Sequence, residues 1–189
     1  MLQQKLLKKV LSVLEDNHID YMITGSLVSS MQGEPRASHD VDIVVNINFS
    51  SISALTEAFP FPQYYLNEES IKGAIVNKTM FNLLDSNEGD KIDFWILLND
   101  PYDQARFSRK IEVNAIGLNM KISKPEDTIL MKLRWAKMGG GSEKQTKDAR
   151  MVYEVQYKNL DLIYMEDWAE KLSIKKLWSE LKKKAKPII

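Results

Sequence analysis

Asp40 and Asp42 are the residues of this sequence whose types and spacing point most directly to chemistry. Residues i and i+2 of an extended chain point to the same side of a strand, so the two carboxylates can share one hard cation such as Mg²⁺. They lead into the apolar run Ile43-Val44-Val45, which is typical of a buried strand. An isolated Asp-x-Asp motif is a weak indication, and its meaning depends on what surrounds it.

A Gly-Ser pair upstream strengthens the indication. Gly25-Ser26 follows the apolar run Tyr21-Met22-Ile23-Thr24, at the point where a strand would pass into a helix. Backbone amides at such a turn and helix start can hold a phosphate. A phosphate-binding turn and a pair of carboxylates in one short stretch indicate a nucleoside triphosphate as the ligand.

A third carboxylate is needed for this chemistry, because phosphoryl and nucleotidyl transfer uses metal ions that bridge the attacked phosphate and the leaving pyrophosphate. Asp93 is the candidate, since it interrupts the apolar strand expected over residues 91–98, where an unpaired charge would be costly. The alternative for Asp93 is a strand-end residue that faces solvent or pairs with a lysine.

The composition narrows the kinds of site that the chain can build. The absence of cysteine excludes disulfides, thiolate zinc sites and cysteine nucleophiles, and two histidines, His18 and His39, are too few for a histidine-rich metal site. The formal net charge is zero, so contact with nucleic acid would need a local patch such as the lysines of residues 182–186, which are otherwise a solvated helix end. No apolar run approaches the about 18 residues that span a bilayer, and we expect a cytoplasmic protein.

Periodicity predicts strands and helices that alternate in the first two thirds of the chain and helices alone after them. Strands are expected over residues 19–24, 41–46, 64–66, 74–76, 80–84 and 91–98, with a hairpin over 110–122. Helices are expected over residues 2–16, 27–32, 50–59, 101–106, 126–138, 142–156 and in the tail from 165. Ser50 or Ser51 is the expected cap of the third of these helices. The spacing of Ser123 with Glu126, and of Ser142 with Gln145, predicts a capping box at two helix starts.

This order of elements predicts an α+β (α/β) fold. A mixed β-sheet flanked by helices is expected over residues 1–122, with a helical C-terminal subregion over residues 123–189 packed on it. The tryptophans, Trp95 among them, are interpreted as core or helix-packing residues.

The motifs together resemble the nucleotidyltransferase superfamily, whose core is polymerase β-like. The resemblance rests on Gly25-Ser26, a spacer of about a dozen residues, Asp40-x-Asp42 at a strand start, and Asp93 on a later strand. The form Arg36-x-Ser38-x-Asp40-x-Asp42 is most similar to the AbiEii-type, toxin-like branch. The resemblance to the superfamily covers residues 19–98 well and the helices of residues 123–156 more loosely.

The resemblance implies Mg²⁺ (or Mn²⁺) as cofactor, held by Asp40, Asp42 and Asp93. The nucleotide-binding residues that it implies are Gly25, Ser26, Arg36 and Ser38. Arg36 could hold the γ-phosphate or brace the loop by pairing with a carboxylate. Ser38 could bond to a metal-bound carboxylate or cap the loop. Members of that branch also carry a helical lysine that contacts the triphosphate and an aspartate that orients or activates the acceptor.

Lys132 and Asp148 fall at comparable places in this chain. The alternative for Lys132 is a position on a solvated helix face, in which case Arg134 or Lys137 would contact the phosphate instead. The alternative for Asp148 is an intrahelical ion pair with Lys144 at i−4.

The function that follows is transfer of a nucleoside monophosphate, from ATP or another nucleoside triphosphate, to an acceptor hydroxyl. The acceptor could be RNA such as a tRNA end, a protein or a small molecule such as an aminoglycoside, and the toxin-like resemblance favours RNA or protein and implies a cognate antitoxin as partner. The alternative from another class is a non-catalytic member of the fold that binds a nucleotide or a partner protein. A phosphohydrolase using the same carboxylates is a third reading.

Overall fold

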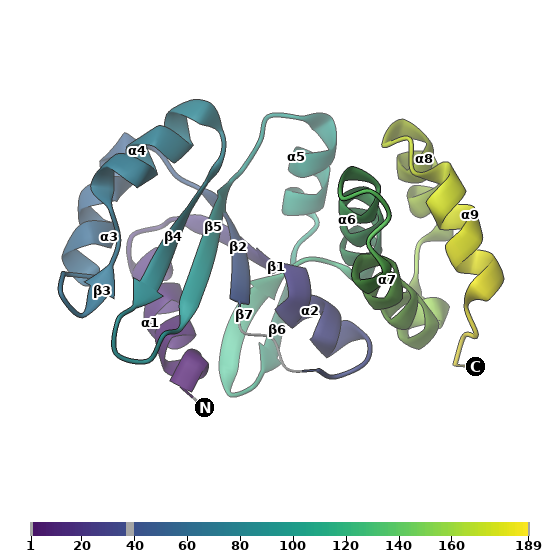
Figure 1. Cartoon of the computed structure of the whole chain (residues 1–189), viewed down its shortest axis with the longest axis horizontal. Helices are drawn as coiled ribbons and strands as arrows, with labels where there is room; N and C mark the ends of the chain where they lie inside the picture. Colours follow the sequence, from purple (N-terminus) through teal and green to yellow (C-terminus); the bar gives the residue numbers. More distant parts are fainter. Residues whose placement is uncertain (1, 37–39, 189) are drawn as a thin grey trace. The chain divides into compact units, whose positions relative to one another are not determined.

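The strands pair into one mixed sheet within the residues that the structure describes, 2–36 and 40–188 (Figure 1). The structure is a computed structural model, and its sheet has seven strands in the order β3-β4-β5-β2-β1-β7-β6. The strands are β1 (Asp20–Thr24), β2 (Asp40–Asn46), β3 (Tyr64–Tyr65), β4 (Met80–Asp85), β5 (Lys91–Ile96), β6 (Ile111–Ala115) and β7 (Leu118–Ile122). β2 runs parallel to β5 and β1 parallel to β7, while the other neighbours are antiparallel. The prediction of a mixed sheet with helices is confirmed.

The register between β2 and β5 positions the acidic residues. Asp42 is the direct partner of Asp93, and Asp40 that of Lys91. Directly paired residues of adjacent strands point to the same face of a sheet, and so do residues i and i+2 of one strand. All four charged side chains therefore share one face, while Val41 and Ile92 between them are buried on the other.

The chain forms two compact units, Met1–Thr24 with Ser38–Ile122, and Gly25–Ala37 with Ser123–Ile189. The first holds the sheet. The second is helical and includes the segment that follows β1, although the sequence predicts a division after residue 122 only. The sequence-based boundary after residue 122 stays a prediction.

The helices of the first unit are α1 (Leu2–Asp16), the 3₁₀ turn η1 (Phe49–Ser51), α3 (Ile52–Ala58), α4 (Glu68–Asn77) and α5 (Pro101–Ser108). The strand expected over residues 74–76 is wrong, because these residues lie in α4. Asn67 caps this helix by accepting a hydrogen bond from the Ser70 amide, and Ile71, Ala74 and Ile75 form its buried stripe. The helical spacing of these buried residues can be recognised in the sequence only when the helix is taken to start after Asn67.

Ser51, one of the two residues expected to cap the third helix, stands at the N-cap position of α3 but makes no side-chain cap bond. The side-chain cap bond occurs one turn earlier, where Asn48 accepts a hydrogen bond from the Ser50 amide at the start of η1. An asparagine carbonyl and a serine hydroxyl serve the same purpose, so the sequence leaves the choice to the local backbone.

The second unit is built from α2 (Gly25–Gln32), α6 (Pro125–Met138), α7 (Glu143–Gln156), the 3₁₀ turn η2 (Tyr157–Asn159), α8 (Leu162–Lys171) and α9 (Lys175–Lys184). Both predicted capping boxes are wrong, since neither N-cap residue, Lys124 or Ser142, makes a side-chain cap bond. The Ser123 hydroxyl instead bonds to the Thr128 hydroxyl at 2.8 Å, and Glu126 is buried and accepts a bond from the Asp161 amide. At the first of the two helix starts, tertiary contacts have taken up the groups that a capping box would use.

A close approach fixes the end of α2 against α7. A Cβ on Gly33 would lie 2.8 Å from the Val152 amide nitrogen and 3.0 Å from the Met151 carbonyl carbon, so this position leaves no room for a side chain. The Gln156 amide also donates to the Gln32 carbonyl at 2.8 Å. Together these contacts hold the loop after α2 beside α7. No helix in the described part of the chain is long and apolar enough to cross a membrane.

Candidate active site

The first group of candidate residues is the acidic face of the sheet in the first unit. It carries Asp40, whose side chain is 60% exposed, Asp42, and Asp93, which is buried. Sequence reasoning selected these three residues, and the structure places them on one face of the neighbouring strands β2 and β5. Among residues 2–36 and 40–188, however, no three carboxylate or imidazole groups are gathered closely enough to hold a metal ion as they stand.

A lysine lies among these carboxylates. The Lys91 ammonium is 2.9 Å from Asp93 Oδ2 and 3.8 Å from Asp40 Oδ1. The hydrogen bond to Asp93 is the largest cause of a raised pKa of Lys91, with the charges of Asp40 and Asp42 contributing, so the ammonium stays protonated. The alternative that Asp93 pairs with a lysine is therefore realised on the same face as the two other aspartates.

Asp42 is oriented by an indole. Trp95 Nε1 donates to Asp42 Oδ1 at 3.1 Å. Trp95 also packs partly against the core cluster of Met22, Val44, Leu97 and Phe107. The interpretation of Trp95 as a packing residue is thus incomplete, because its polar edge fixes the rotamer of a proposed metal ligand.

Asp93 keeps one oxygen without a partner. Its Oδ1 is buried and has no hydrogen bond in the structure, while Oδ2 receives Lys91. Asn82 of β4 is the direct cross-strand partner of Asp93 and is exposed, so its amide lies on the same face. This face therefore offers several oxygen atoms, one of them buried and unused, which is the donor type that Mg²⁺ prefers.

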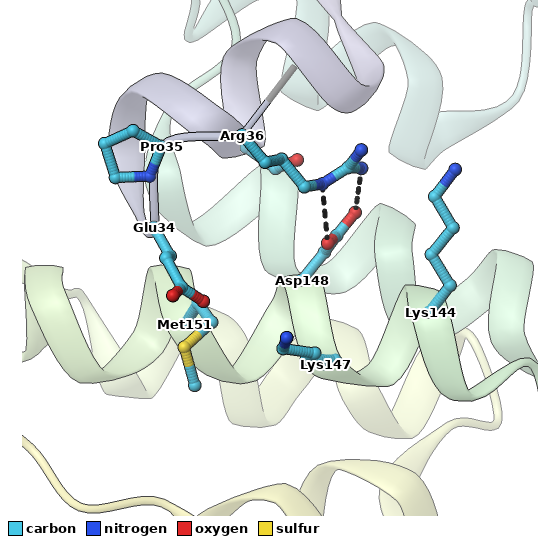
Figure 2. A pocket seen from close by; sticks show the side chains of 8 residues that line it. Glu34, Pro35, Arg36, Lys144, Lys147, Asp148 and Met151 are labelled. Atoms are coloured by element: carbon cyan, nitrogen blue, oxygen red, sulfur yellow. Dashed lines mark hydrogen bonds and ion pairs between the residues drawn. The ribbon is translucent and has the colours of Figure 1, made fainter. Parts of the chain in front are cut away.

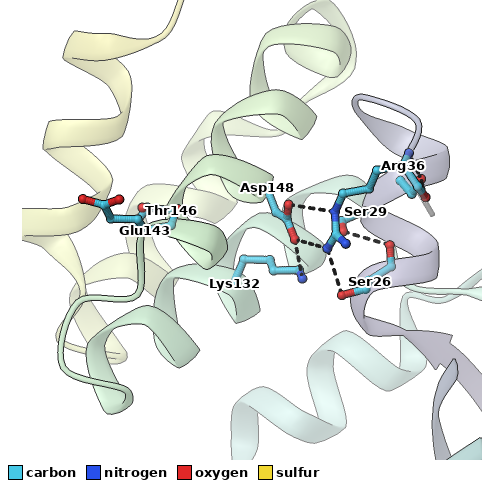
Figure 3. Close-up of polar contacts among 8 residues, drawn as sticks. Ser26, Ser29, Arg36, Lys132, Glu143, Thr146 and Asp148 are labelled. Carbon is cyan, nitrogen blue, oxygen red and sulfur yellow. Dashed lines mark hydrogen bonds and ion pairs between the residues drawn. The ribbon is translucent and has the colours of Figure 1, made fainter. Parts of the chain in front are cut away.

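A second group of candidate residues is a polar and charged cluster within the helical unit (Figure 3). Arg36 donates from Nε to Asp148 Oδ1 at 3.2 Å and from Nη2 to Asp148 Oδ2 at 2.7 Å, and Nη2 also donates to Ser26 Oγ at 3.0 Å. Lys132 Nζ donates to Asp148 Oδ2 at 2.9 Å. Ser26, Arg36, Lys132 and Asp148, which span most of the sequence, are thus joined in one network.

This network bears on the sequence-based alternatives for three residues. Arg36 makes the bidentate pair with a carboxylate that one alternative expects, and its contact with phosphate stays a prediction. Lys132 is 4% exposed, so the solvated helix face is wrong for it. Asp148 pairs with Arg36 and Lys132 rather than with Lys144 at i−4.

The pKa of Asp148 follows from these contacts. Burial acts to raise the pKa, but the hydrogen bonds and charges of Arg36 and Lys132 outweigh it, and the pKa of Asp148 lies below its ordinary value. A carboxylate that is ionised and saturated in this way is a weak proton acceptor. Asp148 is therefore better suited to hold Arg36 and Lys132 in place than to activate an acceptor.

A shallow cavity of about 340 Å³ opens beside this network, lined by Ser29, Glu34, Pro35, Arg36, Lys144, Lys147, Asp148 and Met151 (Figure 2). Lys144 and Lys147 are exposed, and neither side chain makes an ion pair or hydrogen bond within the described ranges. Glu34, the acidic residue of the loop, lies at the same cavity. The cations that line this cavity are Lys144 and Lys147, which are exposed, and Arg36, which is about one third exposed and held by Asp148, while Lys132 is buried.

Comparison with known proteins rests on structure. No protein-family model matches the chain, and no curated protein is significantly similar to it in sequence. A crystal structure of ANT(2")-Ia in complex with adenylyl-2"-tobramycin matches over 92% of this chain and 98% of that one, with a TM-score of 0.61 and 12% identity. The chain has the nucleotidyltransferase fold.

Two further structures share this fold. The lincosamide antibiotic adenylyltransferase LnuA, with lincomycin bound, matches over 80% of this chain and 96% of its own, with a TM-score of 0.52 and 15% identity. An antigenic nucleotidyltransferase-like protein from Paracoccidioides brasiliensis matches over 96% of this chain and 93% of its own, with a TM-score of 0.50 and 17% identity. At these identities the likeness concerns the fold.

Two predicted nucleotide-binding residues remain, Gly25 and Ser38. Gly25 is the first residue of α2 and has φ +73°, a left-handed conformation that favours glycine, which explains the Gly-Ser pair at the end of β1. Ser38, and His39 beside it, lie outside the described residues.

Sequence reasoning missed three polar residues of the acidic face. Lys91 and Trp95 stand two residues before and after Asp93, so the strand period of two could have placed them on its side. Asn82 joins this face only through the pairing of β4 with β5, for which the sequence carries no local signal.

Proposed function

We propose that this chain is a Mg²⁺-dependent nucleotidyltransferase, which transfers a nucleoside monophosphate from a nucleoside triphosphate to an acceptor hydroxyl. The observation that carries the proposal is the placement of Asp40, Asp42 and Asp93 on one face of β2 and β5, in a chain with the nucleotidyltransferase fold. The reaction forms a bond between the acceptor oxygen and the α-phosphorus and breaks the bond from that phosphorus to the leaving pyrophosphate.

Asp40, Asp42 and Asp93 would hold the divalent ion, and the fit is supported by the unused buried oxygen of Asp93 and by the exposure of Asp40. When bound, the ion neutralises negative charge that develops on the phosphates. Trp95 keeps Asp42 in its rotamer. Asp93 is the group of this face that we assign to taking the proton of the acceptor hydroxyl.

For the triphosphate we propose the start of α2 at Gly25 and Ser26, whose amides lie at a helix N-terminus. Ser38 is proposed from the sequence alone. Arg36 would present its guanidinium, one third exposed and fixed by Asp148, as a preorganised cation. Lys132 and Asp148 are proposed as positioning residues of this cluster, acting through Arg36.

The acceptor is proposed to be RNA or protein, as in the toxin-like branch that the Arg36-x-Ser38-x-Asp40-x-Asp42 form resembles, with an antitoxin as partner. The exposed Lys144 and Lys147 support an acceptor with negative charge over a polycationic aminoglycoside. The lysines of residues 182–186 support a negatively charged acceptor less, because Lys182 is paired with Glu166.

The test is incubation of the protein with α-labelled triphosphates, Mg²⁺ and total cellular RNA or protein. We expect label on an acceptor with the parent chain and none with Asp40→Ala/Asp42→Ala. Asp20→Asn is the matched control, because Asp20 pairs with Asn46 at the opposite end of the strand pair from Asp42. Label that persists in the double variant would show that the site is wrong, and label released as free monophosphate would indicate a phosphohydrolase.

A non-catalytic nucleotide-binding role is the second candidate, and it is favoured by the Lys91 ammonium among the carboxylates. It predicts that a triphosphate raises the melting temperature although no label is transferred. Transfer of label by the parent chain alone would exclude it.

A further inference from the structure

The Lys91 ammonium contacts carboxylates that a divalent ion would also have to contact. Lys91 is the first residue of β5, and its ammonium lies within 2.9 Å of Asp93 and 3.8 Å of Asp40, two of the three proposed ligands. An ammonium and a divalent ion compete for the same oxygen atoms, because both are cations and repel each other at such distances.

The face needs a counter-charge when no metal is present. Asp40, Asp42 and Asp93 place three carboxylates on one side of two adjacent strands, and Asp42 faces Asp93 directly. Like charges directly opposite each other in a sheet are destabilising, and Lys91 offsets part of this repulsion. The lysine therefore stabilises the metal-free sheet.

Lys91 can also leave. It stands at the strand start, its side chain is 36% exposed, and its four-carbon stem can carry the ammonium to solvent without moving the backbone. The Asp93 carboxylate, by contrast, is buried, and its Oδ1 has no hydrogen bond even while Lys91 holds Oδ2. The arrangement combines a mobile cation with a fixed oxygen that another ligand could use.

We infer that Lys91 is a resident counter-cation of the metal site: it occupies Asp93 while no divalent ion is bound and must release Asp93 when one binds. This inference rests on the proposed function. Lys91 thereby weakens the binding of a free divalent ion, and an ion that arrives with a triphosphate is favoured, because the phosphates add oxygen ligands and negative charge. Lys91 is thus a residue that sets the affinity and order of metal binding.

The test compares Mn²⁺ binding to the parent and to Lys91→Met by titration calorimetry without nucleotide. Methionine keeps an unbranched apolar stem and removes the charge. We expect at least about tenfold tighter binding, since one charge within about 4–6 Å shifts the ionisation of a carboxylate by one unit or more. We also expect Lys91→Met to melt lower than the parent without metal and to regain the difference in saturating Mn²⁺.

Lys110→Met is the matched control. Lys110 pairs with Asp20 at the same 2.9 Å in the same unit, away from the proposed ligands. We expect Lys110→Met to leave Mn²⁺ affinity unchanged and to lower the melting temperature equally with and without metal. Asp42→Asn in the parent background reports whether the ion binds at this face.

The outcomes separate the inference from the proposed function. If the parent binds Mn²⁺ and Asp42→Asn weakens it, but Lys91→Met binds no more tightly than the parent, the role of Lys91 is refuted and the metal site stands. If no variant binds Mn²⁺, or if Asp42→Asn has no effect, the metal site and the role of Lys91 fall together.

Discussion

Removing the charge of Asp148 is the perturbation that most directly tests the network in the helical unit. Asp148→Asn keeps the size of the side chain but ends the bidentate pair with Arg36 and the ion pair with Lys132. Asp148 is 9% exposed at its side chain and Lys132 5%, so one of the two pairs lies in the protein interior. The variant leaves the Lys132 ammonium there without its carboxylate.

The magnitude follows from this burial. Breaking a buried ion pair by removing one partner costs about 3–5 kcal/mol, and the lower end applies here because Arg36 is one third exposed and can turn to water. We expect a loss of about 3 kcal/mol at pH 7. For a chain of this size that corresponds to a fall of roughly 6–12 °C in melting temperature.

Acidic pH should reduce the difference in the free energy of unfolding between the parent and Asp148→Asn. Because the pKa of Asp148 is lower in the folded protein than in the unfolded chain, its contribution is fully present above the unfolded value of about 4 and is lost as the pH falls through the lower folded pKa. The parent loses this stability on acidification and Asp148→Asn has none to lose. Urea denaturation of both proteins, from pH 7 to below about pH 4, measures the effect.

Asp167→Asn is the matched control. Asp167 pairs with Lys171 on α8, and both side chains are more than half exposed. We expect this variant to cost no more than about 0.5 kcal/mol. If Asp148→Asn were equally mild at pH 7, or if its deficit did not narrow in acid, the network would not stabilise the unit as argued.

Three further predictions concern packing, capping and ligand orientation. Gly33→Ala should lower the free energy of unfolding by about 1–3 kcal/mol, because the added Cβ would lie 2.8 Å from the backbone nitrogen of Val152. Denaturant unfolding measures this loss, and an unchanged free energy of unfolding would mean that α2 is not held against α7. Asn67→Ala should cost about 1 kcal/mol in the same assay through loss of the cap of α4, whereas Asn67→Ser should restore most of it. Trp95→Phe should keep the packing but weaken Mn²⁺ binding by about tenfold, because Asp42 loses the indole hydrogen bond; unchanged affinity in calorimetry would assign Trp95 to the core alone.

Local signals were sufficient for most elements of this fold. The apolar stripe of α1 and the hairpin of β6 and β7 follow from periodicity and turn residues, and both are confirmed. The prediction fails where two periods compete, as over residues 74–76, where three small or apolar residues fit a strand as well as a helix. It also fails at the caps, because Ser123 and Glu126 find partners in Thr128 and Asp161.

The sequence by itself determined the chemistry available to this protein. It placed Asp40 and Asp42 on one side of a strand, because the strand period is two, and it limited metal ligands to oxygen, because cysteine is absent. Asp93 could be selected by its cost inside an apolar strand, although its neighbours could not be known.

Only the tertiary structure decided which groups meet. The parallel pairing of β2 with β5 sets Asp42 beside Asp93 and Asp40 beside Lys91, and the packing of the helical unit joins Arg36 to Asp148 across 112 residues. Such contacts depend on register and on packing of distant segments, which no short window of sequence encodes. For the same physical reason Lys91, an ordinary strand residue in the sequence, becomes in the fold a cation among the proposed metal ligands.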